Sequence, residues 1–212
     1  MSTQAAPLEF TPPEFQEDSA RAGFYALIAR ICHAGPDARL LQSISRADPI
    51  AMEQGNTALA QAWDRLAESA RVTDTEARVE AARAEYDTVF VGTGKAEITP
   101  YASQYLAESM KERVLVRLRE ELAELGLART GAAAEYEDHL TALCEVMRHL
   151  IAAGSDDVAV QKQKAFFLRY LAPWYVEFCA AAIASPNTDF YKHAAGFIKA
   201  FLDVEAESFE MV

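Results

Sequence analysis

Two carboxylate–histidine pairs are the residues best suited by type to hold a metal. Glu135 stands four positions before His139, and Glu145 stands four positions before His149. Di-iron bundles use Glu-x-x-His, in which the two ligands are three residues apart. A pair four apart also shares a helix face, but it is more typical of a surface hydrogen bond. Because no second set of glutamates matches these pairs, the sequence predicts no metal site and no cofactor.

The glycine pair Gly92-Thr-Gly94 is followed by Lys95 and invites comparison with a phosphate-binding loop. Such a loop requires GxxxxGK followed by Ser or Thr, after a strand. Here Ala96 replaces the hydroxyl residue and the preceding segment has a helical pattern. We therefore predict a helix end followed by a loop. No Gly-x-Ser-x-Gly nucleophile motif occurs either, so we expect a protein that is not an enzyme. A weak nucleotide-binding enzyme using this loop is the least favoured alternative.

The dipeptide Asp138-His139 is the most interesting polar pair. It is expected at the beginning of an otherwise apolar helix, where backbone amides favour the negative charge of aspartate. Successive residues of a helix point about 100° apart, so the two side chains would line a surface rather than pair with each other. A capping aspartate beside an ordinary histidine is the alternative interpretation.

Bulk composition limits the classes of function. The chain has 212 residues, of which 51% are hydrophobic and 25% charged, and a formal net charge of −12. This length and composition favour one globular domain. The acidic charge disfavours nucleic acid and anionic membranes and favours a basic partner. Three scattered cysteines, no basic and apolar leader, and no apolar run of about 18 residues predict a cytoplasmic protein without disulfides or stable membrane insertion.

Hydrophobic periodicity predicts an all-α fold, a single-domain bundle of about 8–10 helices. A flexible arm is expected over residues 1–13 and the helical domain over 14–212. We predict a capping box at Thr73–Glu76, an N-cap at Thr99 with Pro100 in the first turn, and a join near Pro173. The expected helices are 14–33, 37–47, 56–71, about 74–91, a short one after 100, 112–125, 135–153, 155–172, a segment ending at 185, and 188–209.

Four sequence blocks resemble, in order and spacing, the TorD/DmsD/NarJ-type chaperones, the redox-enzyme maturation proteins. The resemblance covers about residues 20 to 210. Tyr136 replaces the usual proline of the third block and Tyr170 the usual histidine of the fourth, so the transfer of roles is weaker there. The blocks are Glu85–Gly92, Thr99–Tyr105, Glu135–Leu140 and Phe167–Trp174, followed by Asp189-Phe-Tyr191 and an aromatic helix.

The resemblance implies a TorD-like fold and a cytoplasmic chaperone. Such a protein binds the twin-arginine signal peptide and the apo-form of a molybdoenzyme catalytic subunit. It assists insertion of the molybdenum cofactor and holds back export until maturation is complete. The members most similar in Tyr101–Tyr105, Leu125–Arg129 and Cys144–His149 accompany formate dehydrogenases, and other DMSO-reductase-type enzymes are the alternative partners. A helical structural subunit that works by dimerising is the alternative, and either a monomer or a homodimer is compatible with the sequence.

A groove between helices can take the apolar stretch of such a peptide, and carboxylates can meet its arginines. Asp138 and Glu145 are expected to supply charge and His139 a polar contact. Core packing remains an alternative role for the aromatic residues. The predicted signal-peptide-binding residues are Phe90, Tyr101, Ser103, Tyr105, Asp138, His139, Glu145 and Trp174.

Overall fold

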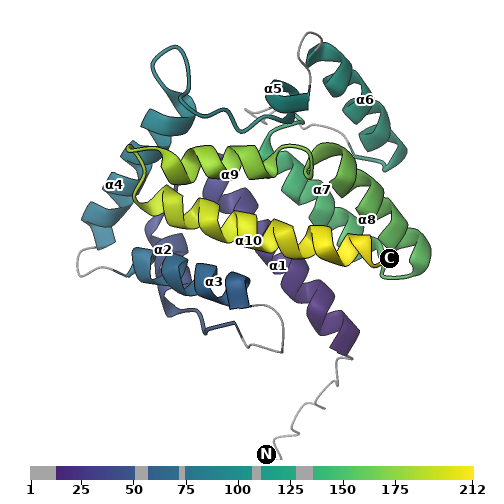
Figure 1. Ribbon diagram of the computed structural model, residues 1–212, viewed down its shortest axis with the longest axis horizontal. Helices are drawn as coiled ribbons and strands as arrows, with labels where there is room; N and C mark the ends of the chain where they lie inside the picture. The colour runs from purple at the N-terminus through teal and green to yellow at the C-terminus, as the bar shows by residue number, and fades with distance from the viewer. Residues whose placement is uncertain (1–12, 51–56, 72–74, 107–110, 128–135) are drawn as a thin grey trace, which may run out of the picture.

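The computed structural model describes residues 13–50, 57–71, 75–106, 111–127 and 136–212. This part of the chain contains ten α-helices and one π-helical turn but no strand, which confirms the all-α, single-domain prediction (Figure 1). Residues 1–12 of the arm predicted over 1–13 lie outside the described residues, as does Thr73 of the predicted capping box, and Pro13 is the first residue of a helix. The helices are α1 (Pro13–Ala34), α2 (Ala38–Arg46), α3 (Thr57–Ala70), α4 (Thr75–Tyr86), the π-helix η1 (Asp87–Val91), α5 (Ala102–Leu106), α6 (Lys111–Glu124), α7 (Leu140–Ala153), α8 (Asp157–Tyr170), α9 (Tyr175–Ala184) and α10 (Phe190–Glu210).

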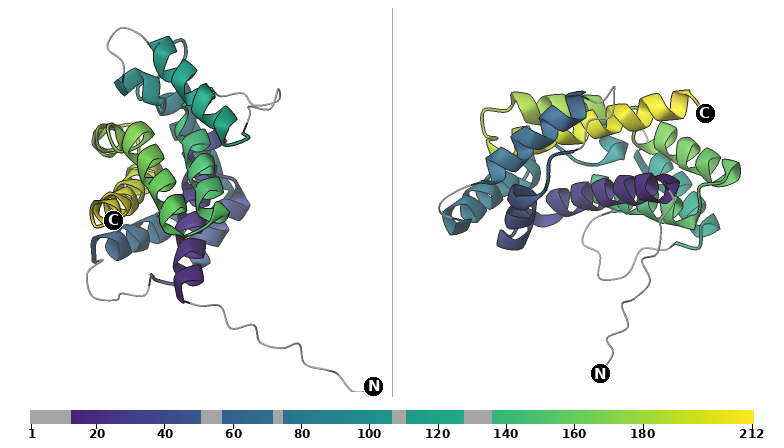
Figure 2. Two further views of the ribbon diagram at one scale, coloured as in Figure 1. Left: turned by 90° about the vertical axis from the view of Figure 1, so that its right-hand side faces the viewer. Right: turned by 90° about the horizontal axis from the view of Figure 1, so that it is seen from below.

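An aromatic cluster joins three helices at the centre of the bundle. Phe24 of α1 lies edge-on to Phe197 and Phe201 of α10, with ring centroids 5.4 and 5.3 Å apart. Trp63 of α3 packs against Phe197 at 5.3 Å. Tilted and edge-on pairs of this kind contribute about 1 kcal/mol each beyond the burial of their area. The cluster therefore fixes α1 and α3 against α10. Figure 2 shows that α1 lies in a different layer from α9 and α10.

Glu205 of α10 is an acidic residue that is buried in the core. Its carboxylate accepts hydrogen bonds from the Arg21 guanidinium at 2.7 and 2.9 Å and from the Tyr25 hydroxyl at 2.9 Å. Arg21 also donates to Gln163 of α8 at 3.1 Å. A buried carboxylate is tolerated only when its charge is paired and its oxygens are hydrogen-bonded. This network therefore fixes α1, α8 and α10 in one arrangement.

Two tyrosine hydroxyls attach α4 and α10 to the end of α1. The last carbonyls of a helix lack partners within the helix. Tyr86 donates to the His33 carbonyl at 2.8 Å, and Tyr191 donates to the Ile31 carbonyl at 3.0 Å. The Gly35-Pro36 end predicted for the first helix is therefore stabilised by side chains from two other helices.

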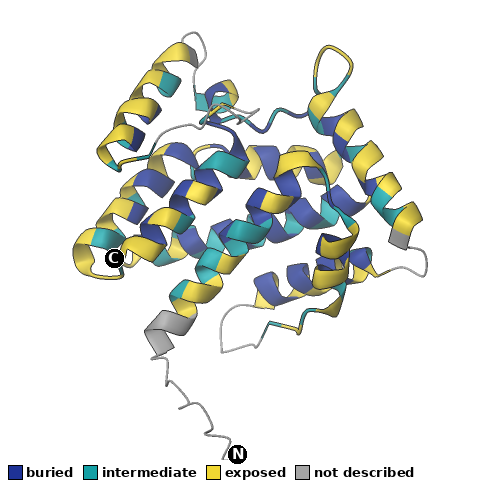
Figure 3. Cartoon of the chain, turned by 180° about the vertical axis from the view of Figure 1, so that it is seen from behind, coloured by how far each residue is buried: buried dark blue, intermediate teal, exposed yellow. Residues whose placement is uncertain are grey.

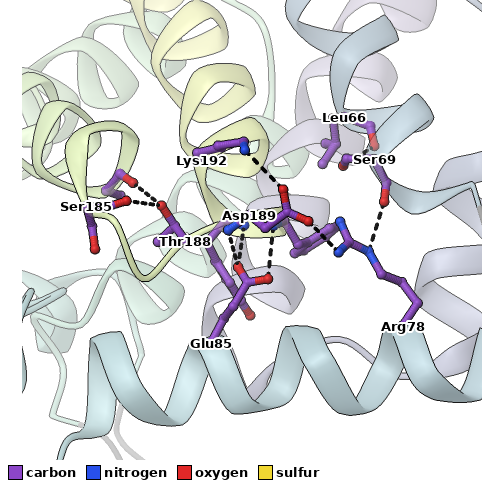
Figure 4. A network of polar contacts seen from close by, with 11 residues as sticks. Leu66, Ser69, Arg78, Glu85, Ser185, Thr188, Asp189 and Lys192 are labelled. Carbon is purple, nitrogen blue, oxygen red and sulfur yellow. Dashed lines mark hydrogen bonds and ion pairs between the residues drawn. The ribbon is translucent and has the colours of Figure 1, made fainter.

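The carboxylate of Glu85 caps the beginning of α10 from the neighbouring helix α4. It accepts the amides of Asp189, Phe190 and Tyr191 at 2.8, 3.1 and 3.1 Å (Figure 4). Arg78, two turns earlier on the same face of α4, donates to the Asp189 carboxylate at 2.7 Å. Because the free amides of a helix N-terminus attract negative charge, Glu85 performs the role of a cap although it lies far away in sequence.

Several predicted helix ends are confirmed, and two are corrected. The join at Pro173 separates α8 from α9, and the predicted break at 185–187 lies between α9 and α10, although α10 begins at Phe190 and not at the predicted 188. The predicted helix ending at Val91 is not α-helical throughout, because its last turn is the π-helix η1, closed by a 2.7 Å bond from the Gly92 amide to the Asp87 carbonyl. The helix predicted from 135 begins only at Leu140.

Burial follows the inner faces of the helices, and the outward faces of α4 and α6 are largely exposed (Figure 3). Leu118 and Leu122 are the buried residues of α6, and its other described side chains are half-buried or exposed. No helix in the described residues combines the length and apolarity needed to cross a membrane.

Candidate functional site

The segments before α5 and α7 lie side by side and form what we call the α5–α7 joint, residues 100–103 and 136–140. Tyr101 and His139 form an isolated antiparallel β-bridge. The joint brings the second and third sequence blocks together, although about 35 residues separate them. Two backbone hydrogen bonds close it, from the Leu140 amide to the Pro100 carbonyl at 2.9 Å and from the Ala102 amide to the Asp138 carbonyl at 2.9 Å.

Asp138 is only 1% exposed, and its carboxylate accepts the Ser103 amide at 2.9 Å. It therefore caps α5, which begins at Ala102. The predicted N-cap at Thr99 with Pro100 in the first turn is wrong, because the capping acceptor comes from another segment of the chain. Asp138 also precedes α7 instead of lying within it, so the expected helical separation from His139 does not apply.

His139 is 2% exposed and is the N-cap of α7. Its backbone is extended, and its Nδ1 accepts the Thr141 amide at 3.1 Å. The imidazole lies edge-on to the Tyr101 ring, with centroids 4.8 Å apart. Both members of the dipeptide thus face inward and stabilise the joint, which matches the capping alternative. In this arrangement a ligand reaches neither side chain, and their part in peptide binding stays a prediction.

An arginine is already bound at the edge of the joint. Arg119 of α6 donates two hydrogen bonds to the Glu137 carboxylate, both 3.0 Å long. The side chain of Glu137 is 10% exposed and that of Arg119 is 49% exposed. The hydrogen bonds that Arg119 donates to Glu137 raise the pKa of Arg119 above its ordinary value, and the charge of Asp138 adds to this effect. The joint is therefore built to hold a planar guanidinium in bidentate geometry.

Glu137 was not among the binding residues predicted from the sequence. The signal was present, because Glu137 directly precedes Asp138 in the third block and makes that block more acidic. Its neighbour Tyr136, 55% exposed, lies edge-on to Tyr101 at 6.5 Å. Glu145 lies further along α7, where it is exposed and pairs with Arg148 at 2.7 Å.

The predicted aromatic residues form a second group around α9. Tyr105 stacks on Trp174 with centroids 5.1 Å apart, and Trp174 contacts Phe178 at 5.6 Å. Phe90 reaches the same Phe178 at 6.0 Å. Trp174 is fully buried, and its indole donates to the Tyr170 carbonyl at 2.5 Å. The core-packing alternative therefore describes Trp174, whereas Tyr105 and Phe90 are half-buried.

Glu177 is a second acidic residue that the sequence analysis missed. It is the one charged residue of α9 and is exposed. Burial raises the pKa of Tyr105 to about 12, and the negative charge of Glu177 contributes to that rise. A single charge on an apolar helix is the pattern that could have revealed it. The structure thus offers Glu137 and Glu177 as acidic residues beside the two aromatic groups.

The geometry does not support a phosphate-binding loop at Gly92–Lys95 or a metal site among the described residues. A Cβ atom at Gly92 would lie 2.3 Å from the Lys95 carbonyl oxygen, so this loop folds tightly on itself and follows the π-helix η1 instead of a strand. It is the predicted helix end, not a phosphate loop. Among the described residues, no group of three or more His, Cys, Asp or Glu is placed to hold a metal ion.

The fold and the α5–α7 joint define a helical protein that holds a guanidinium beside aromatic side chains. The family model described as "Nitrate reductase delta subunit" matches residues 53–180, more than half of the chain. The protein belongs to this family, which confirms the predicted resemblance to the TorD/NarJ-type proteins.

Two curated relatives are similar to this chain, and both carry the name chaperone protein TorD. The protein of Photobacterium profundum is 25% identical over 143 residues, which span 63% of this chain and 66% of the relative. The protein of Aliivibrio fischeri is 24% identical over 133 residues, which span 58% of this chain and 62% of the relative. The chain thus aligns with somewhat less than two thirds of each relative.

Proposed function

We propose that this protein is a chaperone of redox-enzyme maturation that binds a twin-arginine signal peptide in the cytoplasm. The peptide belongs to the apo-form of a molybdoenzyme catalytic subunit, such as a formate dehydrogenase or another DMSO-reductase-type enzyme. Binding assists molybdenum cofactor insertion and holds back export until the subunit is mature. Membership of the family and the chaperone relatives support this function.

The observation that carries the proposal is the bidentate contact between Arg119 and Glu137. A carboxylate that accepts two parallel N–H bonds from one guanidinium can accept them from another. An arginine of the signal peptide would take the place of Arg119, next to the buried charge of Asp138. Lysine lacks the planar fork, so the site discriminates between the two basic residues.

Aromatic side chains around the joint support binding of the apolar stretch that follows the arginines. Tyr136 is exposed, while Tyr101 and Tyr105 are half-buried and can be covered further. Rigid aromatic rings give large contact areas at low entropic cost. The net charge of −12 attracts the basic head of the peptide from a distance and increases its rate of association.

The test is a calorimetric titration with twin-arginine leaders of molybdoenzyme precursors from the same cell. We expect Glu137→Gln to weaken binding about tenfold, since the charge of a carboxylate whose side chain is only 10% exposed is lost. Replacing both leader arginines by lysine should weaken binding to the wild type but change little for the variant. Glu112→Gln, an exposed acidic residue at the beginning of α6, is the matched control. Equal affinities of wild type and Glu137→Gln, with identical circular dichroism, would reject the assigned site.

A further inference from the structure

The outer face of α9 is apolar although nothing in the described structure covers it. Val176 and Ile183 are each 45% exposed, and Ala180 between them is exposed as well. The opposite face of the same helix, with Phe178 and Cys179, is buried in the core. Apart from the exposed Glu177, α9 is apolar on both faces, and a helix that is apolar all round is normally buried all round. The outer face of α9 is therefore typical of a surface that a partner covers.

A hollow of about 370 Å³ lies beside this face, between α3 and α10, and Ile183 lines it. Its floor consists of small residues, with Ala58 and Ala62 on α3 and Gly196 and Ala200 on α10. A Cβ atom added at Gly196 would have no other atom within 4 Å, so the space above it is open. Small residues allow a second helix to approach closely, because interaxial distance follows the side chains at the contact. The hollow therefore has the shape to receive one edge of a helix.

The rim of the hollow is positive. Arg65, Lys192, His193 and Lys199 line it, with Asp203 as the opposing acid. Lys199 pairs with Asp203 at 2.8 Å.

Further contacts leave this positive charge in excess. Lys192 shares Asp189 with Arg78, at 3.0 and 2.7 Å. Arg65 is exposed and makes no ion pair with the residues that the structure describes. Burial, with the charge of Lys192, lowers the pKa of His193, in agreement with a positive local field. The rim is thus cationic in a protein whose net charge is −12.

We propose that the outer face of α9 and the hollow between α3 and α10 together dock an amphipathic, acidic helix of a partner polypeptide. The apolar stripe of that helix covers Val176 and Ile183, and its acidic flank meets Arg65, Lys192 and Lys199. Complementary charge of this kind gives specificity and fixes register. This second surface shares no residue with the α5–α7 joint, and it rests on the proposed function only in taking the partner to be a polypeptide.

Two other occupants fit the surface less well. A second copy of this chain, related by two-fold symmetry, would place the same patch against itself, and the cationic rims would face each other. An anionic membrane would be repelled by the overall charge of −12, and its flat surface cannot fill the hollow. An acidic helix satisfies both the charge and the shape.

The test uses the full chain and two synthetic helical peptides that share one leucine stripe. One peptide carries glutamates beside the stripe and the other carries lysines. We expect wild type to bind the glutamate peptide at least about tenfold more tightly. The triple variant Arg65→Glu, Lys192→Glu and Lys199→Glu should reverse this preference, and Ile183→Lys should weaken binding of both peptides. These charge changes lie on exposed or half-exposed side chains, and circular dichroism checks the fold.

The matched control is Arg46→Glu, Arg113→Glu and Lys162→Glu, three exposed cations elsewhere, which produce the same change in net charge. This control should keep the preference of wild type. No preference between the peptides, or an equal change in both triple variants, would overturn the proposal. So would rim-dependent binding to phosphatidylserine vesicles or rim-dependent self-association without peptide preference. Binding of the twin-arginine leader to the rim variant, measured in parallel, tests the α5–α7 joint separately.

Discussion

Glu85 offers the most direct test of how distant residues hold this fold together, because its carboxylate serves three amides of α10 at once. Replacing a helix cap by alanine costs about 1 kcal/mol, and loss of charge at the first turn adds about 0.5 kcal/mol. Phe190 and Tyr191, two of the residues whose amides lose their acceptor, are buried. We therefore expect Glu85→Ala to lower the free energy of unfolding by about 2–3 kcal/mol.

Urea denaturation and thermal melting measure this loss. For a chain of this size the melting temperature should fall by roughly 5–10 °C. Glu85→Gln retains one acceptor oxygen and should lose about half as much. The control is Glu80→Ala, an exposed residue of the same helix, for which a change within about 0.5 kcal/mol is expected. Equal losses for Glu85→Ala and Glu80→Ala would refute the capping role.

Two further predictions concern titratable groups. The pKa of His193 lies below its ordinary value of 6.5 because of burial and the nearby positive charges of Lys192, Arg78 and Arg65, which outweigh Asp189. The unfolded chain therefore takes up the proton first, so the free energy of unfolding is highest above pH 6.5 and falls as the pH drops toward the folded pKa. In urea denaturation at several pH values, His193→Gln should reduce this decline in the free energy of unfolding. The same pH dependence in wild type and variant would contradict the prediction. Burial raises the pKa of the Cys32 thiol to about 12 and also raises those of Cys144 and Cys179. Ellman's reagent should therefore modify the thiols only as fast as the protein unfolds, and rapid labelling of the native protein would show that one is accessible.

Local sequence signals predicted the helices well. Glycine and proline ended helices where expected at Gly35-Pro36, Pro173 and Gly126, because the backbone restrictions of these residues act within a few positions. The spacing of apolar residues likewise gave the buried faces of α7 and α10. These properties depend on neighbours in sequence, so one sequence is enough to predict them.

The joints between helices could not be predicted in the same way. Asp138 caps a helix that begins 36 positions earlier, and Glu85 caps one more than 100 positions later. A cap supplied by a distant segment leaves no local pattern, and Thr99-Pro100 gave a misleading one. Glu205 illustrates the same limit, since a lone acidic residue near the end of a helix is usually exposed. Glu85 and Asp138, which cap helices distant in sequence, both lie in blocks that carry the family resemblance.

The contact between Arg119 and Glu137 has a consequence for how a twin-arginine peptide would be recognised. The first peptide arginine that reaches Glu137 exchanges one guanidinium for another, so this contact adds only the difference between the two ion pairs, about 1.4 kcal/mol for the tenfold loss expected of Glu137→Gln. Most of the affinity must then come from the second arginine and from the apolar stretch over Tyr136, Tyr101 and Tyr105. Removing Arg119 abolishes the exchange, so Arg119→Ala should bind the leader more tightly than wild type does. Shortening the apolar stretch should cost more affinity than replacing one arginine by lysine, and titration of these two altered leaders compares them directly. If replacing one arginine by lysine costs more affinity than shortening the apolar stretch, Glu137 contributes more than the exchange of Arg119 for a peptide arginine allows.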